Sequence, residues 1–419
     1  MINGAPNNSS FLNQRRYEDP IETGICKRDE FQRDRDRIMH SRAFRRMMHK
    51  TQIFNANIGD HYRNRLTHTL EVSQIARSIG KALGLNDELI EAIALGHDLG
   101  HTPFGHIGER TLHEILMNGA VSKETKICQG FKHNFQSLRI VDELESRCSS
   151  YSGLNLTLAV REGMLKHTST LEKKSNSLII FPECDFNHID LTAPSFTFEG
   201  QVVALADEIA QCTHDLEDSV RSKLISFDAI CQDPFVSRII KESGISLNEN
   251  TNTPVYDTRS LIIKNMVGYF INDACAESSK RISDYLKRYS ANYSSQHDCI
   301  NEKCVMLSPD VEKARDRIYK EMITKRVIYS EQISISDSKA EYIIKQLFKA
   351  FYNHPRQLPD YVLEKHCKRN NIIFNRADLD IKALQADSKF IRTICDHISG
   401  MTDQFAAREY NRLYVPEYK

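Results

Sequence analysis

The chain contains 419 residues, in which 56 lysines and arginines balance 56 aspartates and glutamates for a formal net charge of zero. Its length allows two or three average domains or one large helical domain with additions. The neutral balance argues against a dedicated duplex-DNA binder, because such a protein needs an excess of basic residues to neutralise the phosphates.

The sequence also predicts where the protein resides. No apolar run approaches the ~20 residues that a membrane-spanning helix needs, and the N-terminal stretch lacks the apolar centre of a signal peptide. The eleven cysteines include no CxxC pair, which fits reduced thiols better than a disulfide framework. We therefore expect a cytoplasmic protein with no membrane segment.

Apolar residues recur at helical spacing along most of the chain, which predicts an all-α fold. The helical patterns cover roughly residues 28–50, 66–84, 86–100, 132–145, 156–167, 201–224, 258–288, 309–328, 338–352, 357–370 and 387–412. The best strand candidate is "SLIIFP" at 177–182, and no internal repeat is visible.

Polar, turn-rich stretches at 146–153, 168–198, 244–257 and 289–307 punctuate these helices. The expected regions are an N-terminal helical segment at 1–55, a core at 56–225, a helical extension with polar loops at 226–307 and a C-terminal helical region at 308–419. We expect the C-terminal region to pack as a second layer and not as an independent module.

Histidines are concentrated in one part of the chain, since seven of the sixteen lie between His61 and His133. His68 and His97 each fall on the apolar face of a predicted helix. A lone inward-facing histidine is usually a core residue with a hydrogen-bond partner. Asp98 weakens that interpretation, because a carboxylate buried beside an imidazole needs a partner for its charge.

Asp207 supplies a second inward-facing carboxylate from a third helix, where small and apolar residues lie one turn away. His68, His97, Asp98 and Asp207 would then converge from three helices. Two imidazoles and two carboxylates suit a divalent cation such as manganese, magnesium, iron, nickel or zinc. Such an ion lowers the pKa of its bound water and polarises a phosphoryl oxygen.

The order H…HD…D resembles the metal-binding pattern of the HD-domain metal-dependent phosphohydrolases. The likeness extends to "GDHYRNRLTHTLEV", "HDLGHTPFGHIGE", "FKHNFQSLRIV", "GLNLTLAVREGMLKHT" and "LADEIAQCTHDLED". With "RDRDRIMHSRAFRRMMHKTQIF" and "ISGMTDQFAAREYNRL", these motifs span about residues 33–413. Together they resemble the bacterial dGTPase-like (deoxyguanosinetriphosphate triphosphohydrolase-like) branch.

This resemblance implies an HD-domain catalytic core at 56–225 with an additional C-terminal helical layer. It implies that segment 1–55 contributes to the nucleotide site and to subunit contacts. The implied reaction is metal-dependent hydrolysis of a deoxynucleoside triphosphate, dGTP above the others, at the α-phosphorus. The products would be a deoxynucleoside and intact inorganic triphosphate.

The resemblance also suggests catalytic residues beyond the metal ligands. It places His106 near the α-phosphate, with Glu109 beside it. His106 would either protonate the departing 5′-oxygen or position the nucleophile. His101 would contact phosphate or support the site from behind, or it is a loop histidine bonded to the backbone.

Substrate contacts are expected from a further set of residues. Arg65 lies one turn before His68 and matches a phosphate-contacting arginine of related enzymes. His133, Lys166 and Arg259 are weaker candidates, and for Lys166 a solvated surface charge is the stronger interpretation.

Sugar recognition is expected along one helical stripe, because Asp207, Gln211 and Asp215 are spaced at i, i+4 and i+8. By resemblance Asp215, with Gln52 as its partner, accepts a hydrogen bond from the ribose 3′-OH. The position of Gln211 is usually tyrosine in the family. Glutamine can hydrogen-bond but cannot stack on a sugar, so this departure bears on how strictly deoxyribose is selected.

The expected partners are the dNTP substrate, a nucleotide activator, single-stranded DNA and further copies of the chain, with a hexamer favoured by resemblance. Two alternatives stay open at this stage. One is an HD phosphohydrolase acting on another nucleotide. The other is a non-catalytic sensor of nucleotides or single-stranded nucleic acid, which the absence of tryptophan makes less attractive.

Overall fold

The structure is a computed structural model that describes residues 11–19, 28–54, 61–127, 130–168, 193–245, 255–289 and 300–416. Within these ranges every regular element is helical, and strand-like pairing is limited to two isolated bridges. The predicted all-α class is therefore confirmed. The strand candidate at 177–182 lies outside the described residues.

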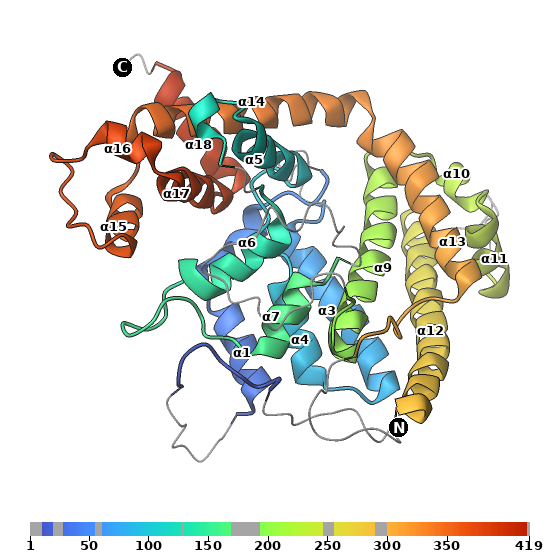
Figure 1. The fold of residues 1–419 in the computed structure, drawn as a ribbon. Helices are drawn as coiled ribbons and strands as arrows, with labels where there is room; N and C mark the ends of the chain where they lie inside the picture. Colours follow the sequence, from blue (N-terminus) through green and yellow to red (C-terminus); the bar gives the residue numbers. More distant parts are fainter. Residues whose placement is uncertain are drawn as a thin grey trace.

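Three helices form the centre of the molecule: α3 (Arg65–Leu83), α4 (Asp87–Gly96) and α9 (Phe198–Arg221). Each packs against the other two. Figure 1 shows them in the middle of the molecule, with α12 (Val255–Tyr289) along the outer side of α9. Helix α1 (Glu30–Met39) packs against α4.

Local sequence signals fix where the central helices begin and end. The Asn64 side chain accepts a hydrogen bond from the Thr67 amide, and the Thr67 side chain accepts one from the Asn64 amide, which forms a capping box at the start of α3. The helix ends at Gly84, whose φ of 73° suits glycine. These limits place His68 in the first turn of α3, opposite His97 at the end of α4.

A tight turn follows α4 and leads directly into α5 (His106–Asn118), a helix that the sequence patterns did not predict. Phe104 and Gly105 both have a φ of 63° in this turn. Gly100 lies against the start of α6, where an added Cβ would stand 2.1 Å from the His133 carbonyl oxygen. Glycine is required there because of this close backbone approach.

The remaining helices surround this centre. They are α2 (Arg42–Arg46), η1 (Met47–His49), η3 (Lys123–Thr125), α6 (His133–Arg139), η4 (Ile140–Leu144), α7 (Leu158–Leu165), α10 (Phe227–Cys231), α11 (Pro234–Glu242), α13 (Pro309–Ile318), η5 (Tyr319–Ile328), α14 (Glu331–Asn353), η6 (Pro355–Gln357), α15 (Asp360–Arg369), α16 (Ile381–Ala386), α17 (Ser388–Ser399) and α18 (Asp403–Tyr414). Segments η4 and η5 have π-helical hydrogen bonding.

Two expected helices are broken by internal caps. The pattern at 387–412 divides into α17 and α18, because the Thr402 side chain accepts a hydrogen bond from the Phe405 amide and starts a new helix. The pattern at 28–50 divides likewise where the Ser41 side chain accepts from the Phe44 amide. In both cases the apolar periodicity continues across the break and conceals it.

The C-terminal helices pack onto α5 as the predicted second layer. Helix α14 contacts α5, α17 and α18, and Figure 1 shows it running across α5. Phe348 and Phe351 of α14 and Phe390 of α17 are fully buried in one apolar cluster with Leu112 of α5. The layer therefore fixes the helix that begins at His106.

None of the helices in the described part of the chain is both long and apolar enough to cross a membrane. The division into four regions at residues 55, 225 and 307 stays a prediction.

Candidate metal centre and catalytic pocket

The structure brings the four predicted metal ligands together. One ligand atom from each of His68, His97 and Asp98 lies within 4.8 Å of the others, and all three residues are buried. Asp207 completes the group from α9, with its Oδ1 2.9 Å from His68 Nε2 and 3.7 Å from His97 Nε2. We call these four residues the metal cluster.

The orientation of His97 fits a metal ligand. Its Nδ1 donates a hydrogen bond to the Ala94 carbonyl at 2.6 Å, so the proton of a neutral ring resides on Nδ1. Its Nε2 is buried and has no hydrogen-bond partner. A ring held through one nitrogen, with the other turned toward carboxylates, is the arrangement that protein metal sites use. The residues present therefore fit a divalent cation.

His214 supports the cluster from behind. It lies two turns after Asp207 on α9, and its Nδ1 is 3.3 Å from His68 Nδ1. Its Nε2 is 3.1 Å from the Glu71 carboxylate. His214 was not among the residues predicted from sequence, although its i+7 spacing from Asp207 is a signal that could have found it.

The electrostatics of the cluster centre on Asp98. Burial opposes ionisation of this carboxyl, but His101, His97 and Arg65 hold its pKa well below the usual range. Burial likewise disfavours a charged His97, yet Asp98 and Asp207 raise the pKa of that ring to about 9. A cation would take the place of that proton beside the two carboxylates.

A second group of histidines lies next to the metal cluster. His101 Nε2 is 3.0 Å from Asp98 Oδ1, and the ring stacks on His133 with centroids 3.9 Å apart. His133 Nε2 lies 3.2 Å from His167 Nε2, and His167 Nδ1 donates to the Met164 carbonyl. We call His101, His133 and His167 the outer histidines.

Glu109 is tied to the outer histidines and not hydrogen-bonded to His106. Its Oε2 accepts hydrogen bonds from the His133 ring Nδ1 at 2.6 Å and from the His133 amide at 3.1 Å. His133 and His101 hold the pKa of Glu109 below its usual range in spite of burial. This carboxylate is therefore ionised and fixed.

His106 is the first residue of α5 and lies beside the outer histidines. Its ring is exposed and meets the His101 ring edge-on, with centroids 5.6 Å apart. Desolvation by the surrounding protein and the nearby Arg65 guanidinium lower the pKa of His106 to about 4. The ring is thus neutral near pH 7 and reachable from solvent.

Arg65 joins the metal cluster to the outer histidines. Its Nη1 donates to Asp98 Oδ2 at 2.9 Å and lies 3.1 Å from His101 Nε2. Its Nε donates to the Thr51 carbonyl, while the buried Nη2 has no hydrogen-bond partner. One guanidinium nitrogen therefore retains its capacity to bind a ligand oxygen.

Lys166 and Arg259 differ from Arg65 in placement. The Lys166 ammonium is buried, 3.1 Å from the Glu162 carboxylate and 3.2 Å from the Pro194 carbonyl. It is not the solvated charge that the sequence favoured, because Glu162 is a buried partner one turn away. Arg259 lies on α12.

The expected sugar-binding residues include two unsatisfied buried oxygens. Asp215 Oδ2 and Gln52 Oε1 are both buried without a hydrogen-bond partner. Burial and the neighbouring Asp218 raise the pKa of Asp215 well above the usual range. Gln211 donates from Nε2 to the Tyr319 hydroxyl at 3.0 Å.

Tyr319 was missed from sequence because more than a hundred residues separate it from Gln211. It is the first residue of the π-helical segment η5, which packs against α9. Burial and the nearby Asp215 raise its pKa, so the hydroxyl stays protonated. The Tyr319 hydroxyl thus contacts Gln211, the position at which the family resemblance leads us to expect a tyrosine.

Comparison with known proteins agrees with this geometry. A family model of the HD domain matches residues 65–211, and one of a phosphohydrolase-associated domain matches residues 305–412. A deoxyguanosinetriphosphate triphosphohydrolase-like protein of Brucella canis is 35% identical over 394 residues, covering 92% of this chain and 90% of the relative. The like-named protein of Rickettsia felis is 37% identical over 391 residues, covering 92% of each. That of Bartonella tribocorum is 36% identical, covering 92% and 90%.

The helical core and its metal cluster are those of a metal-dependent HD-domain phosphohydrolase. Within that class, the chain belongs to the deoxyguanosinetriphosphate triphosphohydrolase-like family.

Replacing His97 by alanine tests the metal cluster. We expect His97→Ala to bind Mn²⁺ about tenfold or more weakly, because it removes a ligand whose Nε2 faces Asp98 and Asp207. Metal content after dialysis against Mn²⁺ would be measured by elemental analysis. The control is His40→Ala, which removes an exposed histidine at the end of α1. Equal metal content in both variants would contradict the assignment.

Proposed function

We propose that the protein hydrolyses deoxynucleoside triphosphates, dGTP above the others, to a deoxynucleoside and inorganic triphosphate. The proposal rests on one observation, in a chain of this family: the metal cluster lies beside Arg65, whose Nη2 has no hydrogen-bond partner. The relatives' names point to dGTP and to a triphosphate product.

Metal binding falls to His68, His97, Asp98 and Asp207. When bound, a divalent cation (manganese, magnesium, iron, nickel or zinc) would supply Lewis-acid polarisation of a phosphoryl oxygen and a lowered pKa for water. The ion pair with Arg65 and the contact with His101 keep Asp98 oriented toward this position.

Phosphate binding is assigned first to Arg65, because its Nη2 can donate to a phosphate oxygen without breaking the bond from Nη1 to Asp98. The outer histidines border the same space. His101 has a buried Nδ1 with no partner, and this nitrogen can donate to a phosphate oxygen in the tautomer in which Nε2 accepts from Arg65 Nη1. His133 would support the site indirectly, because it stacks on the His101 ring and is hydrogen-bonded to Glu109. Lys166 and Arg259 stay weaker proposals, since Lys166 is already paired with Glu162.

Proton transfer is assigned to His106. Its lowered pKa leaves the free ring able to accept a proton from the attacking water, or to hold that water in line. Glu109 is held by His133 and acts on His106 through its negative charge and not by a direct hydrogen bond. The proton would then pass to the departing 5′-oxygen, which leaves the deoxynucleoside neutral.

Sugar recognition is assigned to Asp215 and Gln52, whose buried oxygens Oδ2 and Oε1 can accept the 3′-OH hydrogen bond. We further propose that Gln211 and Tyr319 act together at the sugar. The hydrogen bond between them fixes the orientation of the Gln211 amide.

The proposal includes partners expected from the family. These are a nucleotide activator, single-stranded DNA and an oligomer of this chain, a hexamer by preference. An enzyme acting on another nucleotide and a non-catalytic sensor remain the competing functions.

Product analysis tests the proposed reaction. Purified protein with Mn²⁺ or Mg²⁺ would be given each dNTP and GTP, singly and in pairs, and the products separated by ion-exchange chromatography. We expect deoxynucleoside and inorganic triphosphate, with turnover abolished in Asp207→Ala. Absence of triphosphate in every mixture, with metal bound, would favour the sensor.

The pH dependence of kcat/KM tests the role of His106. With a pKa of about 4, a proton-accepting ring is active at neutral pH and loses activity only as the pH falls toward that value. A ring that must donate a proton would instead lose activity as the pH rises above it. We expect the first profile at saturating metal, and a loss of roughly 100-fold in kcat for His106→Asn. His40→Asn is the control.

Replacing Gln211 by tyrosine tests the sugar assignment. We expect Gln211→Tyr to raise the ratio of kcat/KM for dGTP to that for GTP by about tenfold, because a ring packed on the sugar disfavours a 2′-OH. Tyr319→Phe, which removes only the hydroxyl bonded to Gln211, should lower the same ratio. An unchanged ratio in both variants would contradict a sugar-selecting role.

A further inference from the structure

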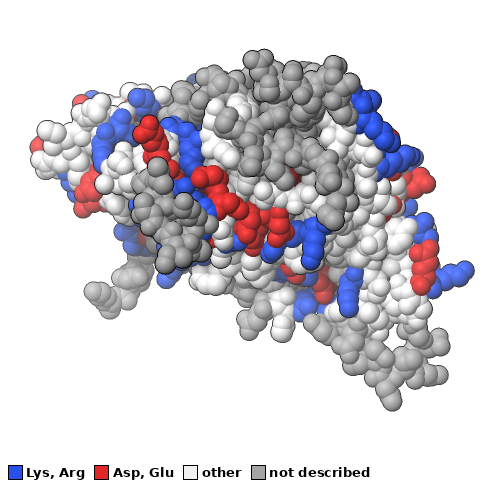
Figure 2. Space-filling view, turned by 90° about the horizontal axis from the view of Figure 1, so that it is seen from below, with Lys and Arg blue, Asp and Glu red and all other residues white. Residues whose placement is uncertain are grey.

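Lys50 is a buried lysine, 3% exposed, that directly follows the short segment η1. Lysine is normally a surface residue, and on the face in Figure 2 the described lysines and arginines lie at the surface among acidic side chains. Burial and the nearby Arg46 lower the pKa of Lys50 to about 7. The interior is therefore unfavourable for this charge, and its presence there needs a physical reason.

The contacts of the Lys50 ammonium give that reason. It donates to the Ser399 carbonyl at 2.9 Å and also to the His101 carbonyl. Ser399 is the last residue of α17, where the final carbonyls have no donor within the helix. A cation at this end also interacts favourably with the helix dipole. The first hydrogen bond thus anchors Lys50 to the C-terminal layer.

The second hydrogen bond reaches the turn between α4 and α5. The Nε2 of His101 lies 3.0 Å from Asp98 Oδ1 and 3.1 Å from Arg65 Nη1, and its ring stacks on His133. Lys50 holds the main chain of this same residue. The ammonium therefore fixes the point from which the His101 ring extends into the pocket.

The main chain next to this ammonium is bound to Arg65. The Arg65 amide donates to the Lys50 carbonyl at 3.1 Å, and Arg65 Nε donates to the Thr51 carbonyl at 3.1 Å. Arg65 and Lys50 both contact His101, the first at its ring and the second at its carbonyl. One hydrogen-bonded unit thus holds His101 from two sides.

Asp403 holds the later part of the same turn. It is the first residue of α18 and is buried. Its Oδ1 accepts from the Phe104 amide at 2.8 Å, and its Oδ2 accepts from the Thr51 amide at 2.9 Å. Phe104 has a φ of 63° and precedes His106 by two residues. Since this conformation is strained for a residue other than glycine, a fixed acceptor for its amide stabilises the path into α5.

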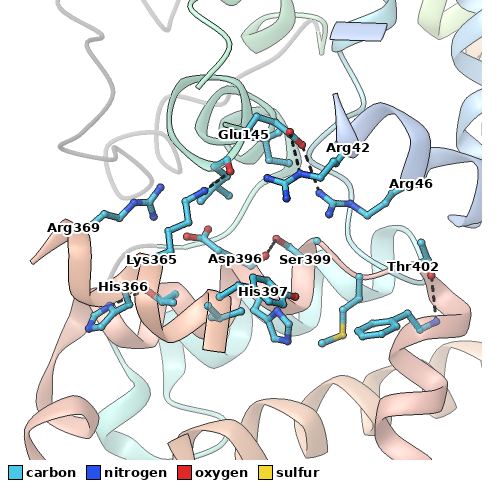
Figure 3. Close-up of a pocket in the computed structure, with 18 of the residues that line it drawn as sticks. Arg42, Arg46, Glu145, Lys365, His366, Arg369, Asp396, His397, Ser399 and Thr402 are labelled. Atoms are coloured by element: carbon cyan, nitrogen blue, oxygen red, sulfur yellow. Dashed lines mark hydrogen bonds and ion pairs between the residues drawn. The ribbon is translucent and has the colours of Figure 1, made fainter. Parts of the chain in front are cut away.

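The support behind both contacts is the turn between α17 and α18. Figure 3 shows Ser399 and Thr402, which lie at its two ends. The Ser399 hydroxyl accepts from Gln136 Nε2 at 3.1 Å, and the Thr402 side chain accepts from the Phe405 amide at 3.2 Å. Because both ends are bound in this way, the turn can serve as a fixed point for the residues that it contacts.

We propose that Lys50 is a positioning residue for the reaction, which sets the place of His101 by joining the turn between α4 and α5 to the turn between α17 and α18. Asp403 plays the matching part at Phe104. Lys50 acts through the His101 carbonyl and is not itself a catalytic residue. The kinetic consequence of this inference rests on the proposed function.

A merely structural role would have a different consequence. Methionine is apolar and of similar length, so Lys50→Met removes a buried charge and its donors at little cost in packing. A structural lysine would affect activity only through the amount of folded protein. A positioning lysine affects the turnover of the folded chain, because a reacting group displaced by about 1 Å can cost about 100-fold in rate.

The test is a double-mutant cycle in kcat, measured on the full-length chain with saturating Mn²⁺ and dGTP. We expect Lys50→Met to lower kcat about tenfold or more, with the melting temperature and Mn²⁺ content little changed. In the His101→Ala background the same substitution should cost less than about threefold, because the ring that Lys50 positions is already absent. Lys339→Met, at an exposed lysine of α14, is the matched control.

Chemical rescue gives a second measurement. Lys50→Ala removes the side chain beyond Cβ, and n-propylammonium supplies the missing atoms. We expect n-propylammonium to raise kcat of this variant, and tetramethylammonium, which has no N–H donor, to leave it unchanged. Equal kcat in Lys50→Met and Lys339→Met would overturn the inference. So would losses that multiply fully in the cycle, or a folded, metal-bound Lys50→Ala chain that n-propylammonium does not restore.

Hydrogen exchange separates this inference from the proposed function, because it does not depend on the reaction. We expect the amides of residues 99–105 to exchange faster in Lys50→Met than in Lys339→Met. That result without triphosphate release by the unsubstituted chain would support the positioning of the turn and overturn the proposed reaction alone. Triphosphate release with unchanged exchange and unchanged kcat in Lys50→Met would overturn the positioning role alone.

Discussion

Asp98 is a buried carboxylate whose negative charge must be matched by groups from three separate segments. Arg65 reaches it from the first turn of α3, His97 from the end of α4, and His101 from the loop that follows. An uncompensated charge in the interior costs several kcal/mol. The packing of α3 on α4 and the turn after α4 are therefore both conditions for keeping this residue ionised. His68 and Asp207 lie on the side of His97, where a cation would complete the balance of charge.

Two of the neighbouring imidazoles, His101 and His167, remain neutral even though carboxylates lie close to them. Burial and Arg65 lower the pKa of His101 well below its usual range, and burial and His97 lower that of His167 to about 3. Neutral imidazoles suit a site for a metal ion and a phosphate, because a neutral ring offers a lone pair to the metal ion and an N–H donor to the phosphate. Arg65 thus serves two purposes, since it balances the charge of Asp98 and helps to lower the pKa of His101 and His106.

Helical periodicity predicted which side chains would converge at the metal cluster, although their roles stay proposals. Each residue of the metal cluster lies on a helix face whose apolar neighbours indicate which way it points, and the structure brings all four together.

Three contacts were not predictable in this way. Glu109 with His133, Gln211 with Tyr319, and Asp403 with Phe104 join segments far apart in sequence. Helix α5 was missed because its glycine-rich approach resembles a turn. The breaks at Ser41 and Thr402 were missed because periodicity continues across a capping residue.

The hydrogen bonds of Lys50 and Asp403 affect how this chain could be truncated, or its C-terminal region exchanged with that of a relative. The segment matched as an HD domain contains all four residues of the metal cluster, yet the turn between α4 and α5 is also held from the last quarter of the chain. Lys50 donates to both the His101 and the Ser399 carbonyls, and the Asp403 carboxylate accepts from the Phe104 amide. A fragment that ended after α9 would expose the apolar face of α5 that α14 covers. The two matched regions are consequently joined at this turn, and exchanging the C-terminal region between relatives would change the contacts that hold it.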